Sequence, residues 1–241
     1  MITGAGSGIG YAIASSLAQS GAKVLLNDLI NDRAERAAGE LHAVPVPGDV
    51  TSEAFLDIVR GYPIDILVNN AGFQHVAPLE EFPPLVFRTM LEVMLVAPFL
   101  LSQAVAPGMR SRGFGRIINI ASIHAKMASA FKSGYVSAKH GLLGLTRTLA
   151  LELAPSDITV NAICPGYVDT PLVRNQLSSL AATHDLESEE AALNAVILGK
   201  VPMKRLIDPD EIAQMVLFLC SDAARSITAQ GYTIDGGMTQ I

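Results

Sequence analysis

Three residues with acid–base or hydrogen-bonding side chains, Ser122, Tyr135 and Lys139, follow one another closely in the sequence. Tyr135 and Lys139 are four apart at the start of a predicted helix, so their side chains lie on one face, one turn apart. A free tyrosine, with a pKa of about 10, is a poor base near neutral pH, but a nearby ammonium group favours the phenolate. Ser122, which ends the preceding predicted strand, can hydrogen-bond a substrate oxygen. The set suits removal of an alcohol proton as hydride leaves the carbon, although a Tyr-x-x-x-Lys pair alone could be an ordinary helix face.

A glycine-rich segment, residues 3–10, opens the first predicted helix. Glycines let the backbone approach a pyrophosphate closely, and a helix N-terminus offers free N–H groups and a partial positive charge. Asp28 ends the second predicted strand. A carboxylate there can accept hydrogen bonds from the ribose hydroxyls of adenosine and would repel the 2′-phosphate of NADP. The two features together predict an NAD site, whereas each alone could be a turn or a cap.

Two further polar segments follow predicted strands. Asp49 and Val50 come after the third strand, and residues 69–72, Asn-Asn-Ala-Gly, come after the fourth. Ligands of open parallel sheets bind beyond the carboxyl ends of the strands. We therefore expect both segments to line the same cleft, although either could be only a turn.

Short apolar segments alternate with longer amphipathic ones, a pattern that predicts a parallel sheet with helices on both faces. The predicted strands are 23–27, 43–46, 64–68, 116–121, 158–163 and 231–235, and the predicted helices are 8–20, 32–41, 51–60, 85–111, 134–153 and 208–221. Only Met1 and Ile2 precede the glycine segment, so the first and central strand is expected to be a truncated stub. The fold class expected for residues 1–241 is a single α/β domain, a doubly wound parallel sheet of the Rossmann type.

Composition excludes several classes of function. The chain has 241 residues, of which 50% are hydrophobic and 17% charged, with a net charge of −6. This balance argues against a nucleic-acid partner, and the longest apolar stretch, 93–101, is shorter than the ~20 residues of a membrane span. The cysteines, Cys164 and Cys220, fit no zinc spacing. With no visible signal peptide, we expect a cytoplasmic protein without a metal.

Along nearly its whole length the chain resembles the short-chain dehydrogenase/reductase family. The resemblance is carried by residues 3–10, Asp49, 69–72, Ser122, Tyr135, Lys139, 165–166 and 235–237. It implies a homotetramer in which Ser122, Tyr135 and Lys139 are catalytic. It also implies an NAD site formed by Gly4, Ser7, Gly8, Ile9, Gly10, Asp28, Asp49, Val50, Asn70, Ala71, Gly72, Tyr135, Lys139, Pro165, Gly166, Val168 and Thr170.

One position departs from the family pattern. The family usually has a catalytic asparagine where this chain has Met94. In the family, the backbone carbonyl of that asparagine holds a proton-relay water, and the backbone carbonyl of Met94 can still do so. The asparagine side chain also supports a kink in the helix, which the Met94 side chain cannot do. The resemblance therefore implies reduced activity or an altered relay rather than lost activity.

A narrower resemblance, carried by residues 73–78, 116–124, 138–141 and 161–173, is to the D-3-hydroxybutyrate dehydrogenases. It implies that Ser122 and Tyr135 bind the reacting end of the substrate, and that its carboxylate is held by Gln74, His124, Lys132 and Gln176. One cation with neutral donors suits a single carboxylate, although each residue alone could be an ordinary surface or capping residue. Two tryptophans of that enzyme are replaced here by Tyr167 and Met238, which predicts a differently shaped pocket.

Residues 171–204 belong to no regular strand–helix unit, so we predict a lid that closes over substrate; a plain surface insertion is the alternative. The expected activity is NAD-dependent interconversion of a short 3-hydroxy acid, D-3-hydroxybutyrate or a close analogue, and its 3-oxo acid. Two alternatives remain: a 3-oxoacyl carrier-protein reductase or broad ketone reductase, and a non-catalytic NAD-binding regulator. Asp28 disfavours the first, and an intact Ser122, Tyr135 and Lys139 disfavours the second.

Overall fold

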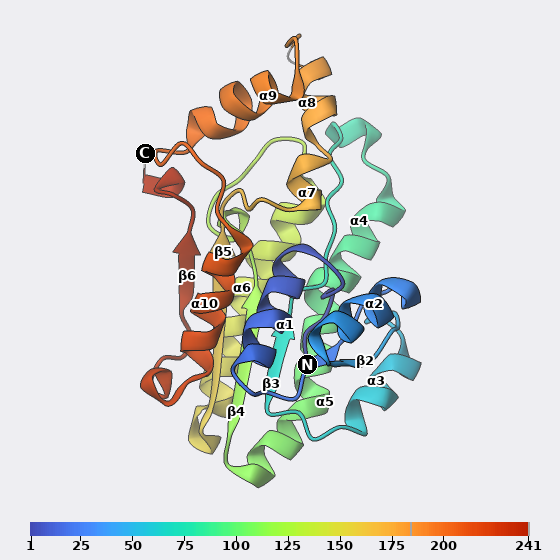
Figure 1. The fold of residues 1–241 in the computed structure, drawn as a ribbon, viewed down its shortest axis with the longest axis vertical. Coiled ribbons are helices and arrows are strands. Elements are labelled where there is room, and N and C mark those ends of the chain that lie inside the picture. The colour runs from blue at the N-terminus through green and yellow to red at the C-terminus, as the bar shows by residue number, and fades with distance from the viewer. Residues whose placement is uncertain (184, 241) are drawn as a thin grey trace.

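The computed structural model describes residues 1–183 and 185–240 and has a parallel sheet at its centre (Figure 1). Four strands pair in the order β3-β4-β5-β6, and β1 pairs with β2. Their bounds are Leu25–Leu26 (β1), Val44–Pro45 (β2), Ile66–Asn69 (β3), Gly115–Ile120 (β4), Ile158–Pro165 (β5) and Gly231–Ile234 (β6). Each predicted strand is therefore present, although β1 and β2 are shorter than expected.

The segment Met1 to Thr3 joins the two groups of strands. Ile2 forms parallel bridges to both Leu26 and Val68. The Thr3 N–H donates to the Val68 carbonyl at 3.0 Å, and the Asn27 N–H donates to the Ile2 carbonyl at 3.0 Å. The predicted stub thus lies between β1 and β3 and places the glycine segment at the carboxyl end of the sheet.

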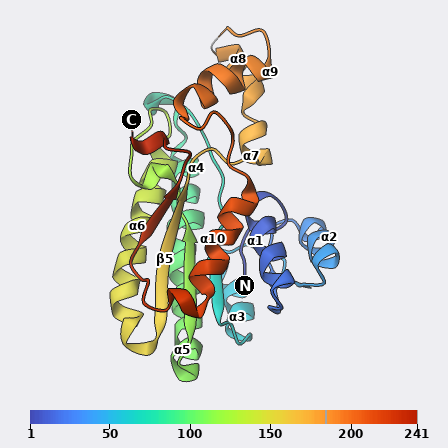
Figure 2. The same cartoon turned by 60° about the vertical axis from the view of Figure 1, so that its left-hand side comes forward.

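Helices cover both faces of the sheet, as Figures 1 and 2 show. Their bounds are Gly8–Gln19 (α1), Asn31–Leu41 (α2), Glu53–Arg60 (α3), Pro84–Leu91 (α4), Ala97–Arg112 (α5), Ser133–Leu153 (α6) and Pro209–Cys220 (α10). Neighbouring strand residues point to opposite faces: Ile118 packs in a core with α1 and α10, and Ile117 in a core with α3, α5 and α6. The doubly wound α/β fold is therefore present.

The predicted helix 85–111 is one continuous helical stretch with a break in its hydrogen bonding. A π-helical turn at Glu92–Val96 separates α4 from α5, and the Ala97 N–H donates to the Glu92 carbonyl. Pro98, which lacks an N–H, follows directly. Met94 is at the centre of this turn and is buried. The irregular turn is therefore present without an asparagine side chain, and its hydrogen bonding involves the backbone alone.

The stretch Pro84–Arg112 is also long and apolar enough, by length and composition alone, to cross a membrane. Its most apolar window has a mean hydropathy of 1.8, and 33% of that window is buried. The stretch includes Pro98, Pro107 and Glu92, and its two helices pack on α3 and α6 within the domain. A core helix of an α/β domain has the same composition.

Residues 171–204, the predicted lid, form short helices beyond the carboxyl end of β5 (Figure 1). They are Pro171–Arg174 (α7), Leu177–Thr183 (α8) and Glu189–Ala192 (α9), followed by turns at Leu193–Ile197 and Leu198–Lys200. Val173, Leu177 and Ile197 form a small apolar cluster against Tyr167. The segment thus has its own core, while His184 lies outside the described residues.

Candidate active site

Two neighbouring cavities lie along the carboxyl ends of the strands and share Asn70, Gly72 and Phe73. The outer cavity, about 450 Å³, is lined by Gly4, Ser7, Asn27, Asp28, Leu29, Ile30, Arg33, Gly48, Asp49, Val50, Thr51, Asn70, Ala71, Gly72, Phe73, Thr89 and Val93. The catalytic cavity, about 130 Å³, is lined by Ile9, Asn70, Gly72, Phe73, Gln74, Met94, Ile120 to His124, Lys132, Tyr135, Lys139, Pro165 to Val168, Thr170, Leu172, Val173 and Gln176.

The glycine segment forms the wall between the sheet and α1. Gly4 has φ 61°, and a Cβ on it would lie 2.8 Å from the Cα of Ala71, so only glycine fits. Gly8 and Gly10 line neither cavity: a Cβ on Gly10 would lie 2.5 Å from the Gly4 carbonyl, and Gly8 packs on Thr170. Gly8 and Gly10 therefore allow close packing of the loop on neighbouring backbone and side chains, while Gly4, Ser7 and Ile9 line the cavities.

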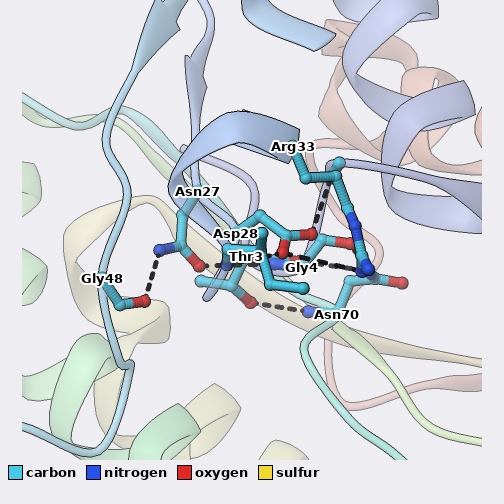
Figure 3. Close-up of polar contacts among 9 residues, drawn as sticks. Thr3, Gly4, Asn27, Asp28, Arg33, Gly48 and Asn70 are labelled. Carbon is cyan, nitrogen blue, oxygen red and sulfur yellow. Dashed lines mark hydrogen bonds and ion pairs between the residues drawn. The ribbon is translucent and has the colours of Figure 1, made fainter. Parts of the chain in front are cut away.

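Side-chain amides hold this loop in place (Figure 3). Asn70 donates from Nδ2 to the carbonyls of Thr3 and Gly4, at 3.0 and 2.9 Å. Asn27, which is buried, accepts from the Gly4 N–H through Oδ1 and donates from Nδ2 to the Gly48 carbonyl. The loop after β3 and the loop after β2 are therefore tied to the glycine segment.

Asp28 lies at the rim of the outer cavity with its carboxylate turned toward the loop. Its Oδ2 accepts the Gly6 N–H at 3.2 Å, and its Oδ1 accepts the Ile30 N–H at 3.0 Å. Asp28 is buried, and the next residue, Leu29, is apolar and exposed. A carboxylate fixed in this way can accept further hydrogen bonds from a ligand hydroxyl in the cavity.

Ser122, Tyr135 and Lys139 meet in the catalytic cavity. Ser122 follows β4 and accepts the His124 N–H, while Tyr135 and Lys139 are on the first two turns of α6. Lys139 Nζ lies 5.6 Å from the centre of the Tyr135 ring and donates to the Ile120 carbonyl at 2.7 Å. The predicted grouping of the three side chains is therefore present.

Electrostatics in this group differ from the expectation. Burial raises the pKa of Tyr135, and a hydrogen bond with Ser122 opposes that shift. Burial also lowers the pKa of Lys139 to about 8. The protein's own groups therefore do not lower the pKa of the phenol, because the loss of hydration on burial is the largest cause of its shift.

The four predicted carboxylate ligands all line the catalytic cavity. Gln74 Nε2 and His124 Nδ1 are buried and have no hydrogen-bond partner among the described residues, although a hydrogen bond with the Met127 backbone raises the pKa of the His124 ring. The His124 ring packs edge-on against Tyr135, and burial lowers the pKa of His124 to about 4. Burial also lowers the pKa of Lys132. Gln176 differs from the others, since its amide already donates to the Leu172 carbonyl.

The loops that carry these residues are joined by a backbone hydrogen bond. The Ala77 N–H, three residues after Gln74, donates to the Phe131 carbonyl at 3.0 Å. Phe131 precedes Lys132 and has φ 65°, a region that bulky side chains rarely adopt. This contact joins the two loops from which Gln74 and Lys132 line the cavity.

Two residues that line the outer cavity, Asn27 and Arg33, were not among the predicted site residues. Asn27 is adjacent to Asp28, and a polar residue inside a predicted buried strand could have indicated it. Arg33 is an ordinary first-turn residue of α2, and only the fold brings it to the outer cavity. Met94 lines the catalytic cavity with its side chain close to Gly72, where a Cβ would lie 3.0 Å from the sulfur.

Comparison with known proteins places this architecture in a family. Residues 4–239 match the family model described as enoyl-(acyl carrier protein) reductase. An uncharacterized oxidoreductase of Bacillus subtilis, YxjF, is 49% identical, with 99% of this chain and 97% of that protein covered. A D-beta-hydroxybutyrate dehydrogenase of Rhizobium meliloti is 43% identical over the same shares.

Relatives with other names and solved structures match over similar lengths. An acetoacetyl-CoA reductase of Rhizobium meliloti is 38% identical, with 98% of this chain and 96% of that protein covered. The structure of an actinorhodin polyketide ketoreductase variant with NADPH superposes with a TM-score of 0.95 at 32% identity, covering 100% of this chain and 96% of that one. The chain therefore belongs to the short-chain dehydrogenase/reductase family of oxidoreductases.

Proposed function

We propose that the protein is an NAD-dependent dehydrogenase that interconverts a short 3-hydroxy acid, D-3-hydroxybutyrate or a close analogue, and its 3-oxo acid. One observation supports this proposal above the others. Two buried polar atoms of the catalytic cavity, Gln74 Nε2 and His124 Nδ1, have no hydrogen-bond partner among the described residues, and Lys132 lines the same cavity. A buried polar atom without a partner is costly, so its partner is expected to come from a ligand. Relatives at 43% and 40% identity are named D-beta-hydroxybutyrate dehydrogenases.

The chemistry divides between the residues as follows. Gln74, His124 and Lys132 bind the carboxylate, and Ser122 hydrogen-bonds the hydroxyl oxygen of the substrate. Tyr135 accepts the hydroxyl proton as the carbonyl forms, and Lys139 provides positive charge beside the phenol. NAD, if bound along these cavities, would supply the hydride acceptor, a ring that is positively charged in its oxidised form.

NAD is the proposed cofactor. Asp28 supports it because a buried carboxylate just after β1 can accept hydrogen bonds from ribose hydroxyls and would repel a 2′-phosphate. The two cavities together provide space along the carboxyl ends of the strands for a dinucleotide, and Asp49, Val50, Ala71 and Thr170 line them at the predicted places. The residues that line the two cavities therefore fit a nicotinamide dinucleotide, the cofactor that the family uses.

Two other relatives are named acetoacetyl-CoA reductases, which suggests a 3-oxoacyl thioester as an alternative substrate class. A thioester offers no carboxylate to Lys132 and its neighbours, so the polar end of the cavity favours the free acid. A regulator that only binds NAD would not require Tyr135 and Lys139 in the catalytic cavity, so their presence there favours an enzyme.

We further propose that the protein is a cytoplasmic homotetramer. Phe99 on α5 is 41% exposed and Leu151 on α6 is 74% exposed, so each helix has one large apolar side chain at its surface that pairing between subunits would bury. The cysteines Cys164 and Cys220 are free, as is usual in a reducing compartment. Light scattering of the unchanged protein and of Phe99→Glu tests the assembly: a tetramer that persists in the variant would contradict this interface.

The activity is tested by following NADH formation from D- and L-3-hydroxybutyrate, and NADH or NADPH oxidation with acetoacetate and with acetoacetyl-CoA. We expect turnover of the D-acid and of acetoacetate, and loss of both in Tyr135→Phe with NAD binding retained. Equal turnover in Tyr135→Phe would contradict the mechanism. Efficient use of acetoacetyl-CoA alone would contradict the substrate, and tight NAD binding without turnover of any hydroxy acid would favour the regulator.

A further inference from the structure

One polar side chain that lines the catalytic cavity, that of Tyr167, has no place in the function described so far. Two other polar residues outside the reaction and the carboxylate site, Asn70 and Thr170, already donate to backbone carbonyls of the protein. The Tyr167 hydroxyl forms no hydrogen bond with the described residues, and burial alone raises the pKa of this phenol. Among the described polar side chains of the cavity, that of Tyr167 is therefore the one with neither a role nor a partner.

The Tyr167 ring is held between two parts of the molecule. It packs against the apolar cluster that contains Ile123, the residue after Ser122. It also packs against the cluster of the predicted lid that contains Leu177. The Tyr167 carbonyl accepts the Ile207 N–H at 2.9 Å, which fixes the backbone of the same residue. Because close packing on two sides restricts the ring, its hydroxyl is kept in place beside the cavity.

The order of the strands separates Tyr167 from the residues proposed to bind the carboxylate. Gln74 comes after β3, Ser122 after β4 and Tyr167 after β5, and these three strands are neighbours in the sheet (Figure 1). Since neighbouring strands are about 4.8 Å apart, Ser122 lies between Gln74 and Tyr167 along the carboxyl edge of the sheet. A substrate with its carboxylate toward Gln74 and its reacting hydroxyl at Ser122 therefore directs the other end of its carbon chain toward Tyr167.

In D-3-hydroxybutyrate that other end is the C4 methyl group, which cannot form a hydrogen bond with a phenol. A hydroxyl that loses water on ligand binding and gains no partner costs free energy. A hydroxyl group on C4 would remove this cost, since two hydroxyls can each donate and accept. The chemistry of Tyr167 therefore favours a substrate with a polar C4 over one with a methyl group there.

We propose that Tyr167 is a specificity-determining residue whose hydroxyl binds a hydroxyl group on C4 of the substrate. The preferred substrate class is then a short 3,4-dihydroxy acid, oxidised at C3. This inference rests on the proposed function, because that function places the carboxylate and the reacting hydroxyl in the catalytic cavity.

The test compares three acids with the same spatial arrangement at C3. They are D-3-hydroxybutyrate, the 3,4-dihydroxybutyrate, and the 3-hydroxypentanoate that has a methyl group in place of the C4 hydroxyl. Values of kcat/KM with NAD are measured for the unchanged protein and for Tyr167→Phe, which keeps the packed ring and removes only the hydroxyl. We expect the unchanged protein to favour the dihydroxy acid over the pentanoate. In Tyr167→Phe, kcat/KM for the dihydroxy acid should fall about three- to tenfold, the effect of one neutral hydrogen bond, and the other two values should be nearly unchanged.

A matched variant and the pattern of losses decide between the possible results. Tyr62→Phe removes the same hydroxyl from an exposed residue that lines neither cavity, so it should leave all three values unchanged. A preference of the unchanged protein for the pentanoate, a preference for the dihydroxy acid that persists in Tyr167→Phe, or equal losses for all three acids would overturn this inference alone. Failure of the unchanged protein to oxidise any of the three acids would overturn the proposed function as well.

Discussion

Replacement of Lys132 by methionine is predicted to remove recognition of the substrate carboxylate while leaving hydride transfer in place. Lys132 is the cation beside Gln74 and His124 in the catalytic cavity, and methionine keeps much of its apolar stem. A hydrogen bond between charged groups contributes about 1.5–3 kcal/mol. At about 1.4 kcal/mol for each tenfold change, kcat/KM for D-3-hydroxybutyrate should fall about 10- to 100-fold.

The assay compares two substrates that differ only in charge, D-3-hydroxybutyrate and its methyl ester, in both proteins. The ester has no carboxylate, so its kcat/KM should be nearly the same with lysine or methionine at position 132. Lys200→Met is the matched control, since Lys200 is close enough to lower the pKa of Lys132 but does not line the cavity. It should change kcat/KM for the acid by less than about fivefold. Equal losses for acid and ester in Lys132→Met would refute carboxylate recognition at this end of the cavity.

Three other outcomes are expected. Lys139→Met should move the rising limb of the kcat/KM profile for alcohol oxidation to higher pH, because the phenolate of Tyr135 loses its neighbouring cation; an unmoved limb would contradict that role. Met94→Ala should lower the free energy of unfolding in urea by about 2–5 kcal/mol because it leaves a void beside Gly72, whereas Met94→Leu should cost less than about 1.5 kcal/mol. Hydrogen bonds with Arg205 and with the Asp208 backbone lower the pKa of Glu211 to about 2. The Glu211 carboxylate therefore stabilises the folded state fully above the pKa of about 4.3 that it has in the unfolded chain. This contribution to the free energy of unfolding is lost as the pH falls toward 2. The stability difference between the unchanged protein and Glu211→Ala should therefore narrow over that interval in thermal melts, and a constant difference would argue against the shift.

The features that sequence patterns predicted well are those with a strong local cause. The predicted helix 208–221 is present as α10, because its start has local causes: Asp208 and Glu211 form a reciprocal capping box and Pro209 is in the first turn. Apolar, β-branched runs identified β4 and β5, which are buried along their whole length. Tyr135 and Lys139 could be paired because helical spacing alone places them on one face.

The features that sequence patterns did not predict depend on contacts between distant segments. The π-helical turn around Met94 has no signature in apolar periodicity, since a one-residue insertion in the helix leaves the pattern nearly unchanged. β1 is only two residues long because it pairs with the short segment around Ile2 and with β2, rather than with a full strand. Arg33 reaches the outer cavity because α2 packs beside the glycine segment, and an exposed helix residue has no local feature that indicates this.

Burial changes how the catalytic pair must be understood. If proximity of Lys139 decided the charge state, the pKa of Tyr135 would be lowered; instead it is raised, and that of Lys139 is lowered to about 8. Both shifts favour the uncharged forms, because each charge loses hydration in the same enclosed space. In the proposed reaction, the phenolate would form readily only with further positive charge nearby, which an oxidised nicotinamide ring would supply. A reduced ring would carry no such charge, and Tyr135 would then stay protonated as a donor for the reverse reaction, so burial of the phenol would suit the proposed role of Tyr135 in both directions.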